Sequence, residues 1–319
     1  MTAPAAGPSP EAFNLFYCDQ FVLPLPAEHR FPMSKYALLR ERLRREPALA
    51  AGRFSVPPAA SLQALKRVHS EAYLDALISG ALPRAIERRI GFPYSEQMVE
   101  RSRRSVGGTM AAAEAALECG LAVNLAGGTH HAFADTGGGY CVLNDVAVAA
   151  RYAQSSLGVG QVLVVDLDVH QGDGTAAIFS EDSSVFTFSM HGGKNYPTRK
   201  QTSDLDVALD DGTDDEAYLN RLQGILPGLL RELRPDLVFY LAGADPFAGD
   251  RLGRLSLSKA GLAKRDSRVF DFLRRADVPA AVCMAGGYAD SVEDIVSIHT
   301  ATVLAAHESW RQWQGNSLT

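Results

Sequence analysis

The segment from residue 162 to residue 175, VLVVDLDVHQGDGT, constrains the fold more than any other part of the chain. Its first four residues are apolar and mostly β-branched, which is typical of a strand buried on both faces. Four ionisable side chains follow at once: Asp166, Asp168, His170 and Asp173. Because ionisable groups beside a buried strand need partners or a ligand, the segment predicts a buried strand that ends in a functional site.

Short apolar runs occur at four places along the chain: the run just described, at residues 161–168, and three others at 185–191, 235–245 and 278–287. Stretches with helical spacing separate them, such as EAYLNRLQGILPGLLREL at residues 216–233. This alternation indicates a parallel sheet covered by helices on both faces. We therefore predict an α/β fold with three layers, a central and mostly parallel sheet flanked by helices. Sites in such folds form at the carboxyl ends of the strands.

The rest of the chain is consistent with one domain. Residues 1–12 are rich in Ala and Pro and predict a flexible leader, and residues 13–319 predict a single catalytic domain without internal repeats. FNLFY at 13–17 predicts a first strand, and SKYALLRERLRRE at 34–46 an amphipathic helix. The run after Gly107 and Gly108, TMAAAEAALEC, predicts a helix that ends at Gly120.

Composition excludes several classes of function. A formal net charge of −6 argues against sequence-independent binding to a nucleic-acid backbone. The four cysteines show no Cys-x-x-Cys spacing, which argues against a thiolate zinc site and a disulfide framework. The N-terminal segment resembles no signal peptide and no stretch is long and apolar enough for a membrane span. We expect a soluble cytoplasmic protein without nucleic-acid or membrane partners. The basic run Arg101, Arg103 and Arg104 suggests a solvated helix start or an ion pair, with the mouth of a site as the alternative.

The residues after two of the predicted strands suit a metal ion. Residues two apart in an extended chain face the same side, so Asp166, Asp168 and His170 share one face. A second strand ends at Asp245. Asp168, His170 and Asp245 together offer nitrogen and oxygen ligands for an open catalytic zinc site, with iron or cobalt as alternatives. Each aspartate alone is more typical of a helix cap or a turn, so the interpretation depends on the set.

Two other loops carry polar side chains suited to catalysis. His130 and His131 lie in GGTHHAFADTGGGYC, framed by glycines. Asp166 and Asp173 are not needed by the metal, and each is expected to bind one imidazole N–H, which fixes the tautomer and raises basicity. Tyr288 follows the apolar run CMAGG, where its phenol could donate a hydrogen bond to an oxyanion.

Four segments, in this order, resemble the histone deacetylase superfamily: GGTHHA, DLDVHQGDGT, AGADPFAGDRLGRLSLS and AGGYAD. The resemblance covers about residues 13–312. Within it, HRFPMSKY and ERSRRSVGGT are more similar to class IV deacetylases and their bacterial relatives than to class I or II enzymes. The resemblance implies an arginase-deacetylase fold, with the metal at the strand ends beneath a narrow tunnel.

The resemblance also implies a role for each residue of these motifs. His131 would be the general acid and base, His130 its electrostatic partner and Tyr288 the group that polarises the substrate carbonyl. Gly139 and Tyr140 would line the acyl-lysine tunnel, where the family more often has Phe at the second position. The zinc ligands would be Asp168, His170 and Asp245. A potassium ion is expected near Asp166, Asp168, His170, Ser189 and Met190, bound largely through backbone oxygens.

The expected activity is zinc-dependent hydrolysis of the amide bond of N-acyl-lysine, by a deacetylase or a fatty deacylase that uses metal-activated water. The substrate is then an acyl-lysine protein. The alternatives are a deacetylase of small acylated amines such as acetylpolyamines, and a catalytically inactive module that binds acyl-lysine. A ureohydrolase related to arginase would need a second metal and more carboxylates than AGADPFAGD provides. The acyl chain, the carrier and the oligomeric state stay open.

Overall fold

The computed structural model describes residues 11–26 and 28–316, so the predicted leader lies almost wholly outside the described residues. Within them the chain forms one sheet of eight parallel strands, in the order β2-β1-β3-β8-β7-β4-β5-β6. The strands are β1 (Asn14–Phe16), β2 (Arg53–Ser55), β3 (Leu121–Asn124), β4 (Val162–Asp166), β5 (Val185–Gly192), β6 (Leu205–Leu209), β7 (Leu237–Leu241) and β8 (Ala280–Cys283).

The four apolar runs form β4, β5, β7 and β8, which confirms the predicted parallel sheet. The two edge strands β2 and β6 were not predicted. β2 has three residues, all half-buried, and β6 alternates half-buried with exposed positions before its buried last residue. Neither strand is covered on both faces, so neither carries the continuous apolar signal of a central strand.

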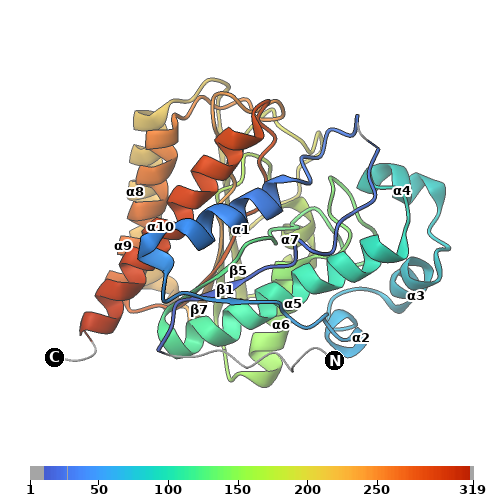
Figure 1. Ribbon diagram of the computed structural model, residues 1–319, viewed down its shortest axis with the longest axis horizontal. Coiled ribbons are helices and arrows are strands. Elements are labelled where there is room, and N and C mark those ends of the chain that lie inside the picture. The colour runs from blue at the N-terminus through green and yellow to red at the C-terminus, as the bar shows by residue number, and fades with distance from the viewer. Residues whose placement is uncertain (1–10, 27, 317–319) are drawn as a thin grey trace.

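Helices cover both faces of the sheet. They are α1 (Lys35–Arg45), α2 (Leu62–Leu65), α3 (Glu71–Ser79), α4 (Arg84–Ile90), α5 (Glu96–Cys119), α6 (Asp145–Ser156), α7 (Asp173–Phe179), α8 (Asp215–Leu233), α9 (Lys259–Ala276) and α10 (Val292–Asn316), with a 3-10 turn at Pro47–Leu49. In Figure 1, α8, α9 and α10 lie together on one side, while α5 and α6 run beneath the sheet. This arrangement confirms the three-layer α/β architecture.

Alternation along the central strands builds a separate core on each face. In β4, Leu163 and Val165 pack with α1, α8, α9 and α10, whereas Val162 and Val164 pack with α5, α6 and α7. All four are buried. Because successive strand side chains point to opposite faces, a strand apolar throughout can serve both cores. A third cluster joins α2, α3 and α4 to the first half of α5.

Helix α5 is longer than predicted. It begins at Glu96 and runs through Gly107 and Gly108, where glycine ordinarily disfavours a helix. Close packing explains the two glycines, because a Cβ on Gly107 would lie 1.9 Å from the carbonyl oxygen of Pro58. The helix ends as predicted at Gly120, whose φ of +87° is accessible to glycine.

The basic run lies inside α5 and not at a solvated helix start. Arg101 is buried, and its Nη1 donates hydrogen bonds to the carbonyl oxygens of Cys18 and Phe21 at 3.0 and 3.2 Å. Arg104 forms the expected kind of ion pair, with Glu100 at 2.7 Å. The prediction of a solvated helix start was therefore wrong, and the ion-pair interpretation holds for Arg104.

Candidate active site

Asp168, His170 and Asp245 meet at the carboxyl ends of two neighbouring strands. Asp168 and His170 follow β4, Asp245 follows β7, and the two strands pair along their whole length. All three side chains are buried, and one ligand atom of each lies within 4.8 Å of the others. His170 Nδ1 is 3.0 Å from Asp168 Oδ1 and 3.2 Å from Asp245 Oδ2. The predicted ligand set is thus assembled in space.

Glycines make room for this cluster. A Cβ on Gly286 would lie 1.9 Å from Asp245 Oδ2 and 2.6 Å from Asp168 Oδ2, and one on Gly243 would lie 2.7 Å from Asp245 Oδ1. Backbone amides hold the carboxylates in place, since Gly286 N donates to Asp168 Oδ2 at 2.7 Å and Val169 N donates to Asp245 Oδ1 at 2.9 Å. Asp245 Oδ2 is buried and accepts no hydrogen bond within the described residues.

The electrostatics of the cluster suit a cation. Burial alone lowers the pKa of His170, but the adjacent carboxylates of Asp168 and Asp245 outweigh it and raise the pKa to about 10. Burial, together with the charge of Asp168, raises the pKa of Asp245 to about 7. Two buried carboxylates this close need a positive charge between them. A divalent ion on the nitrogen and two oxygens would supply that charge and satisfy Asp245 Oδ2, so the donor set fits a metal.

His130 and His131 lie beside this cluster, each against its own carboxylate. His130 Nδ1 donates to Asp166 Oδ2 at 2.7 Å, and His131 Nδ1 donates to Asp173 Oδ1 at 2.6 Å. The two Nε2 atoms are 3.2 Å apart. The four side chains are buried. Each imidazole therefore has a fixed ring orientation, with Nδ1–H directed at its carboxylate, the arrangement expected from the two surplus aspartates.

The two rings differ in their affinity for a proton. Burial lowers the pKa of His130, but Asp166 and Asp168 outweigh it and raise the pKa to about 9. For His131, burial and the positive charge of His130 lower the pKa to about 4. At neutral pH these pKa values make His130 the protonated ring of the pair and His131 the neutral one, and the Nε2 of His131, which faces the Nε2–H of His130, is its basic atom. Such a divergence within one pair is a recurrent sign of acid–base function.

Tyr288 lies in the loop that follows β8, and this loop is held from several sides. Its backbone N donates to Asp250 Oδ2 at 2.6 Å, and its ring centroid lies 6.5 Å from that of His170. Burial and the charges of Asp168 and Asp245 hold the pKa of the phenol well above its usual value. Tyr288 therefore stays protonated at neutral pH and can donate a hydrogen bond.

A narrow pocket reaches the cluster, the two histidines and Tyr288, and its walls include Gly139 and Tyr140. The Tyr140 ring lies 5.8 Å from that of Tyr288. Gly139 has a φ of +53°, and a Cβ there would lie 2.5 Å from His131 Cδ2. The backbone at Gly139 therefore lies so close to the ring of His131 that only glycine fits at this position.

Sequence reasoning missed two residues near the pocket. Tyr196 is 41% exposed, and its ring stands edge-on to His131 with centroids 4.8 Å apart. It lies on the same side of Gly139 as His131, and its Cε1 is 3.1 Å from the position of a Cβ on that glycine. The aromatic residue before Pro197, after β5, was the available signal. Asp250 was missed as well, although it belongs to the AGADPFAGD motif and binds the backbone N of Tyr288.

The residues expected near a potassium ion are also close together. Asp166 and Ser189 are paired in register across β4 and β5, and Met190 follows in the same strand. Ser189 Oγ lies 2.9 Å from His191 Nδ1. These contacts do not test a monovalent cation, so the potassium site stays a prediction.

Comparisons with known proteins cover most of the chain. A family model described as the histone deacetylase domain matches residues 29–303. An uncharacterised protein of Picosynechococcus sp. is 45% identical over 296 residues, covering 93% of this chain and 99% of that protein. Histone deacetylase 2 of Arabidopsis thaliana is 34% identical over 284 residues, covering 84% of this chain and 73% of that protein.

A solved structure agrees with the fold. The HD domain of HDA15 superposes with a TM-score of 0.74 at 23% sequence identity, and the match covers 93% of each chain. At that identity the likeness supports the fold alone. In the part of the chain that the structure describes, no helix has both the length and the apolarity to cross a bilayer.

Proposed function

The chain belongs to the histone deacetylase family, and on that premise we propose that it is a zinc-dependent amidohydrolase that removes the acyl group from N-acyl-lysine. The observation that carries the proposal is one narrow pocket that opens onto Asp168, His170, His131 and Tyr288 together. A metal-binding cluster, a neutral imidazole and a protonated phenol can together supply the electrophile, the proton transfer and the oxyanion donor that favour hydrolysis of an unactivated amide.

The metal ligands would be Asp168, His170 and Asp245. When bound there, zinc supplies a Lewis acid that polarises the acyl carbonyl and lowers the pKa of a water molecule. We propose zinc as the metal because histone deacetylases are generally zinc-dependent.

His131 is proposed to move the proton. Because Nδ1 donates to Asp173, its Nε2 is the atom that accepts a proton from the attacking water. The same nitrogen then returns the proton to the departing lysine amine. His130, kept cationic by Asp166, sets the electrostatic environment in which His131 stays neutral until the reaction begins.

Tyr288 is proposed to donate its O–H to the acyl oxygen as negative charge develops there. Donors placed in advance at the position of an oxyanion stabilise the transition state more than the substrate. Gly139 and Tyr140, which line the pocket, and Tyr196 beside His131 would enclose the extended lysine stem, which would keep water from the reacting carbonyl.

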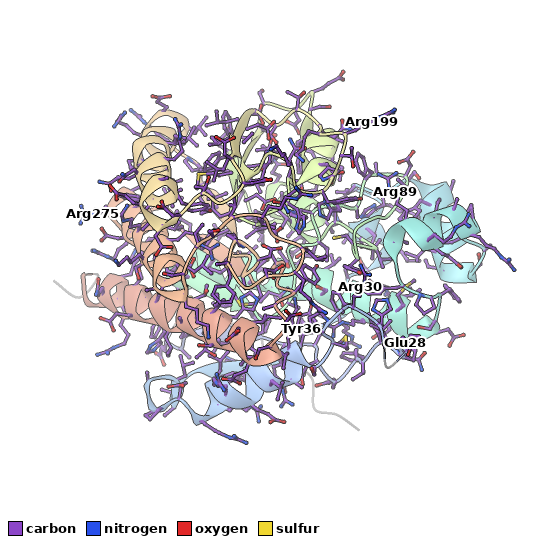
Figure 2. The ribbon with its side chains drawn as sticks, turned by 90° about the horizontal axis from the view of Figure 1, so that it is seen from above. Glu28, Arg30, Tyr36, Arg89, Arg199 and Arg275 are labelled. Carbon is purple, nitrogen blue, oxygen red and sulfur yellow. The ribbon has the colours of Figure 1, made fainter. Side chains whose placement is uncertain are left out.

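Charges around the pocket favour acyl-lysine over acetylpolyamines. Arg89 lies beside Gly138, the neighbour of the pocket residue Gly139, and Arg199 follows Tyr196 by three residues. Arg251 donates to the carbonyl oxygens of Tyr288 and Arg30 and pairs with Asp290. Figure 2 shows Arg30, Arg89 and Arg199 on one part of the molecule and Arg275 at the opposite end. Among the described residues, Arg30, Arg89 and Arg199 form no ion pair. An arginine-rich entrance repels a polycation.

The test is a turnover assay with matched substrates. Purified protein with its metal content measured would be incubated with acetyl-lysine peptides, long-chain acyl-lysine peptides and acetylpolyamines, each with and without a chelator. We expect chelator-sensitive hydrolysis of an acyl-lysine peptide by protein that contains about one zinc per chain. Hydrolysis of acetylpolyamines alone would replace the proposed substrate class. Stoichiometric zinc and peptide binding without turnover would indicate the inactive binding module.

Three finer expectations stay predictions: placement in class IV, a cytoplasmic location and the absence of direct contact with nucleic acid. The oligomeric state is open.

A further inference from the structure

Lys35 is a buried cation in an unusual place. It is the first residue of α1, and its exposed fraction is 2%. The N-terminus of a helix carries positive partial charge, so a lysine there is disfavoured. Among the described residues no carboxylate lies within ion-pair distance of its ammonium group. A buried charge without a counter-ion at contact distance needs other stabilising contacts.

Those contacts come from the loop that carries Tyr288. Lys35 Nζ donates a hydrogen bond to the carbonyl oxygen of Gly287 at 3.2 Å, which joins residues 252 positions apart. The same nitrogen lies over three aromatic rings, with 5.1 Å to the centroid of Tyr288, 5.3 Å to that of Tyr36 and 5.4 Å to that of Phe31. All three distances are within the range of a cation–π interaction.

The hydrogen bonds of the loop show why this contact matters. The carbonyl oxygen of Gly286 accepts from Ala244 N at 2.8 Å, and that of Tyr288 accepts from Arg251 Nε at 2.9 Å. The carbonyl between them, on Gly287, has Lys35 as its donor. Gly287 has a φ of +155°, a backbone conformation that residues other than glycine rarely adopt. Lys35 therefore fixes the peptide directly before Tyr288.

We propose that Lys35 is a positioning residue for Tyr288, which holds the phenol ring toward the metal ligands and strengthens its O–H as a hydrogen-bond donor. A cation over the face of a phenol draws electron density from the ring and favours donation from the hydroxyl. This inference rests on the proposed role of Tyr288 in catalysis. If Lys35 only stabilised the loop, its effect on activity would not depend on the phenol oxygen of Tyr288. A positioning role requires that dependence.

A double-mutant cycle tests that requirement. Lys35→Met keeps the apolar stem and removes the charge and the donor, and Tyr288→Phe removes the phenol oxygen. We expect Lys35→Met to lower kcat about 30-fold, from the loss of a desolvated cation–π contact, with KM within about twofold of the parent. In the Tyr288→Phe background the same change should lower kcat less than about threefold, because the group through which Lys35 acts is already gone.

Two further variants complete the design. Lys35→Arg keeps the charge and a donor, and should retain more kcat than Lys35→Met. Lys66→Met is the matched control, because Lys66 is solvent-exposed and pairs with Glu71 away from the pocket. We expect kcat of this control to equal that of the parent.

Amide hydrogen exchange over residues 285–290 gives a readout that needs no substrate. Lys35→Met should speed exchange in this loop and leave the metal content unchanged, whether or not the substrate class has been identified. A kcat loss of the same size in both backgrounds would overturn the positioning role, as would a change confined to KM or to thermal stability. Unchanged kcat in Tyr288→Phe alone would overturn the proposed chemistry together with this inference. A normal kcat in Lys35→Met with a depressed kcat in Tyr288→Phe would overturn the inference alone.

Discussion

The buried pair Arg265–Asp266 on α9 supports the loops that carry two of the proposed metal ligands. Arg265 Nη1 donates to the carbonyl oxygens of Leu167 and Gly243, at 3.2 and 2.7 Å. Leu167 directly precedes Asp168, and Gly243 lies two residues before Asp245. Arg265 Nε lies 2.8 Å from Asp266 Oδ1, and both residues are fully buried. We predict that replacing Arg265 by Met costs both stability and metal affinity.

The size of the stability loss follows from what the substitution leaves behind. Asp266 would keep two donors, Tyr240 Oη and Thr302 Oγ1, each at 2.5 Å, but would lose its counter-charge inside the core. Removing one partner of a buried ion pair costs about 3–5 kcal/mol. Because domains typically have a free energy of unfolding of about 5–15 kcal/mol, the variant should remain mostly folded after such a loss. Replacing Arg265 by Met and Asp266 by Leu together should cost less than Arg265→Met alone, since no isolated charge then remains.

Urea unfolding at pH 7, followed by the fluorescence of Trp310 and Trp313, measures the stability loss. A chelator competition on the folded variants measures zinc affinity. Arg254→Met serves as the control, because Arg254 is exposed and its pair with Asp211 lies at the surface; this change should cost less than about 1 kcal/mol. A loss below about 1 kcal/mol for Arg265→Met, or a double variant less stable than the single one, would contradict the reasoning.

Three further outcomes are expected. Asp245→Ala should lose bound zinc, and added zinc should no longer raise its Tm, whereas the parent Tm should rise with zinc concentration. Tyr288→Phe should keep its zinc and lose about 100- to 1000-fold in kcat, the usual effect of removing one oxyanion donor, as a steady-state assay would show. Burial lowers the pKa of His69 from 6.5 to about 4. As the pH falls through that range, His69 becomes protonated in the unfolded chain but stays neutral in the folded chain. Stability should fall accordingly by up to about 3 kcal/mol, and His69→Gln should flatten this dependence in urea titrations from pH 7 to pH 4.

The central sheet and the metal cluster could be predicted because both leave a local signal. Strands buried on both faces are apolar throughout, and their carboxyl ends share one edge, so polar residues after β4 and β7 had to meet. Asp168 and Asp245 are 77 positions apart, yet their place after paired strands was enough. The surplus of carboxylates likewise indicated that Asp166 and Asp173 would face the histidines.

Residues whose role depends on long-range packing left no comparable signal. Lys35 looks like any lysine of an amphipathic helix, and its burial comes from the loop of Tyr288, which is distant in sequence. Gly107 suggested a helix boundary because glycine lowers helix propensity, but the neighbouring Pro58 requires a residue without Cβ there. Tyr196 left only a weak signal, an aromatic residue before Pro197, and its place at the site became clear from the contact of its ring with His131.

The charges of the site explain why Lys35 has no carboxylate of its own. Four buried aspartates surround the site, Asp166, Asp168, Asp173 and Asp245. If a divalent ion were bound, with His170 as a neutral ligand and His130 protonated, these four carboxylates would keep one uncompensated negative charge in a medium of low dielectric constant. The ammonium group of Lys35 is buried against the loop of Tyr288, over the face of the phenol ring, and would add one positive charge next to the site. A lysine at a helix N-terminus can thus be buried without contact to an acid, because a carbonyl oxygen and three aromatic rings surround its ammonium group.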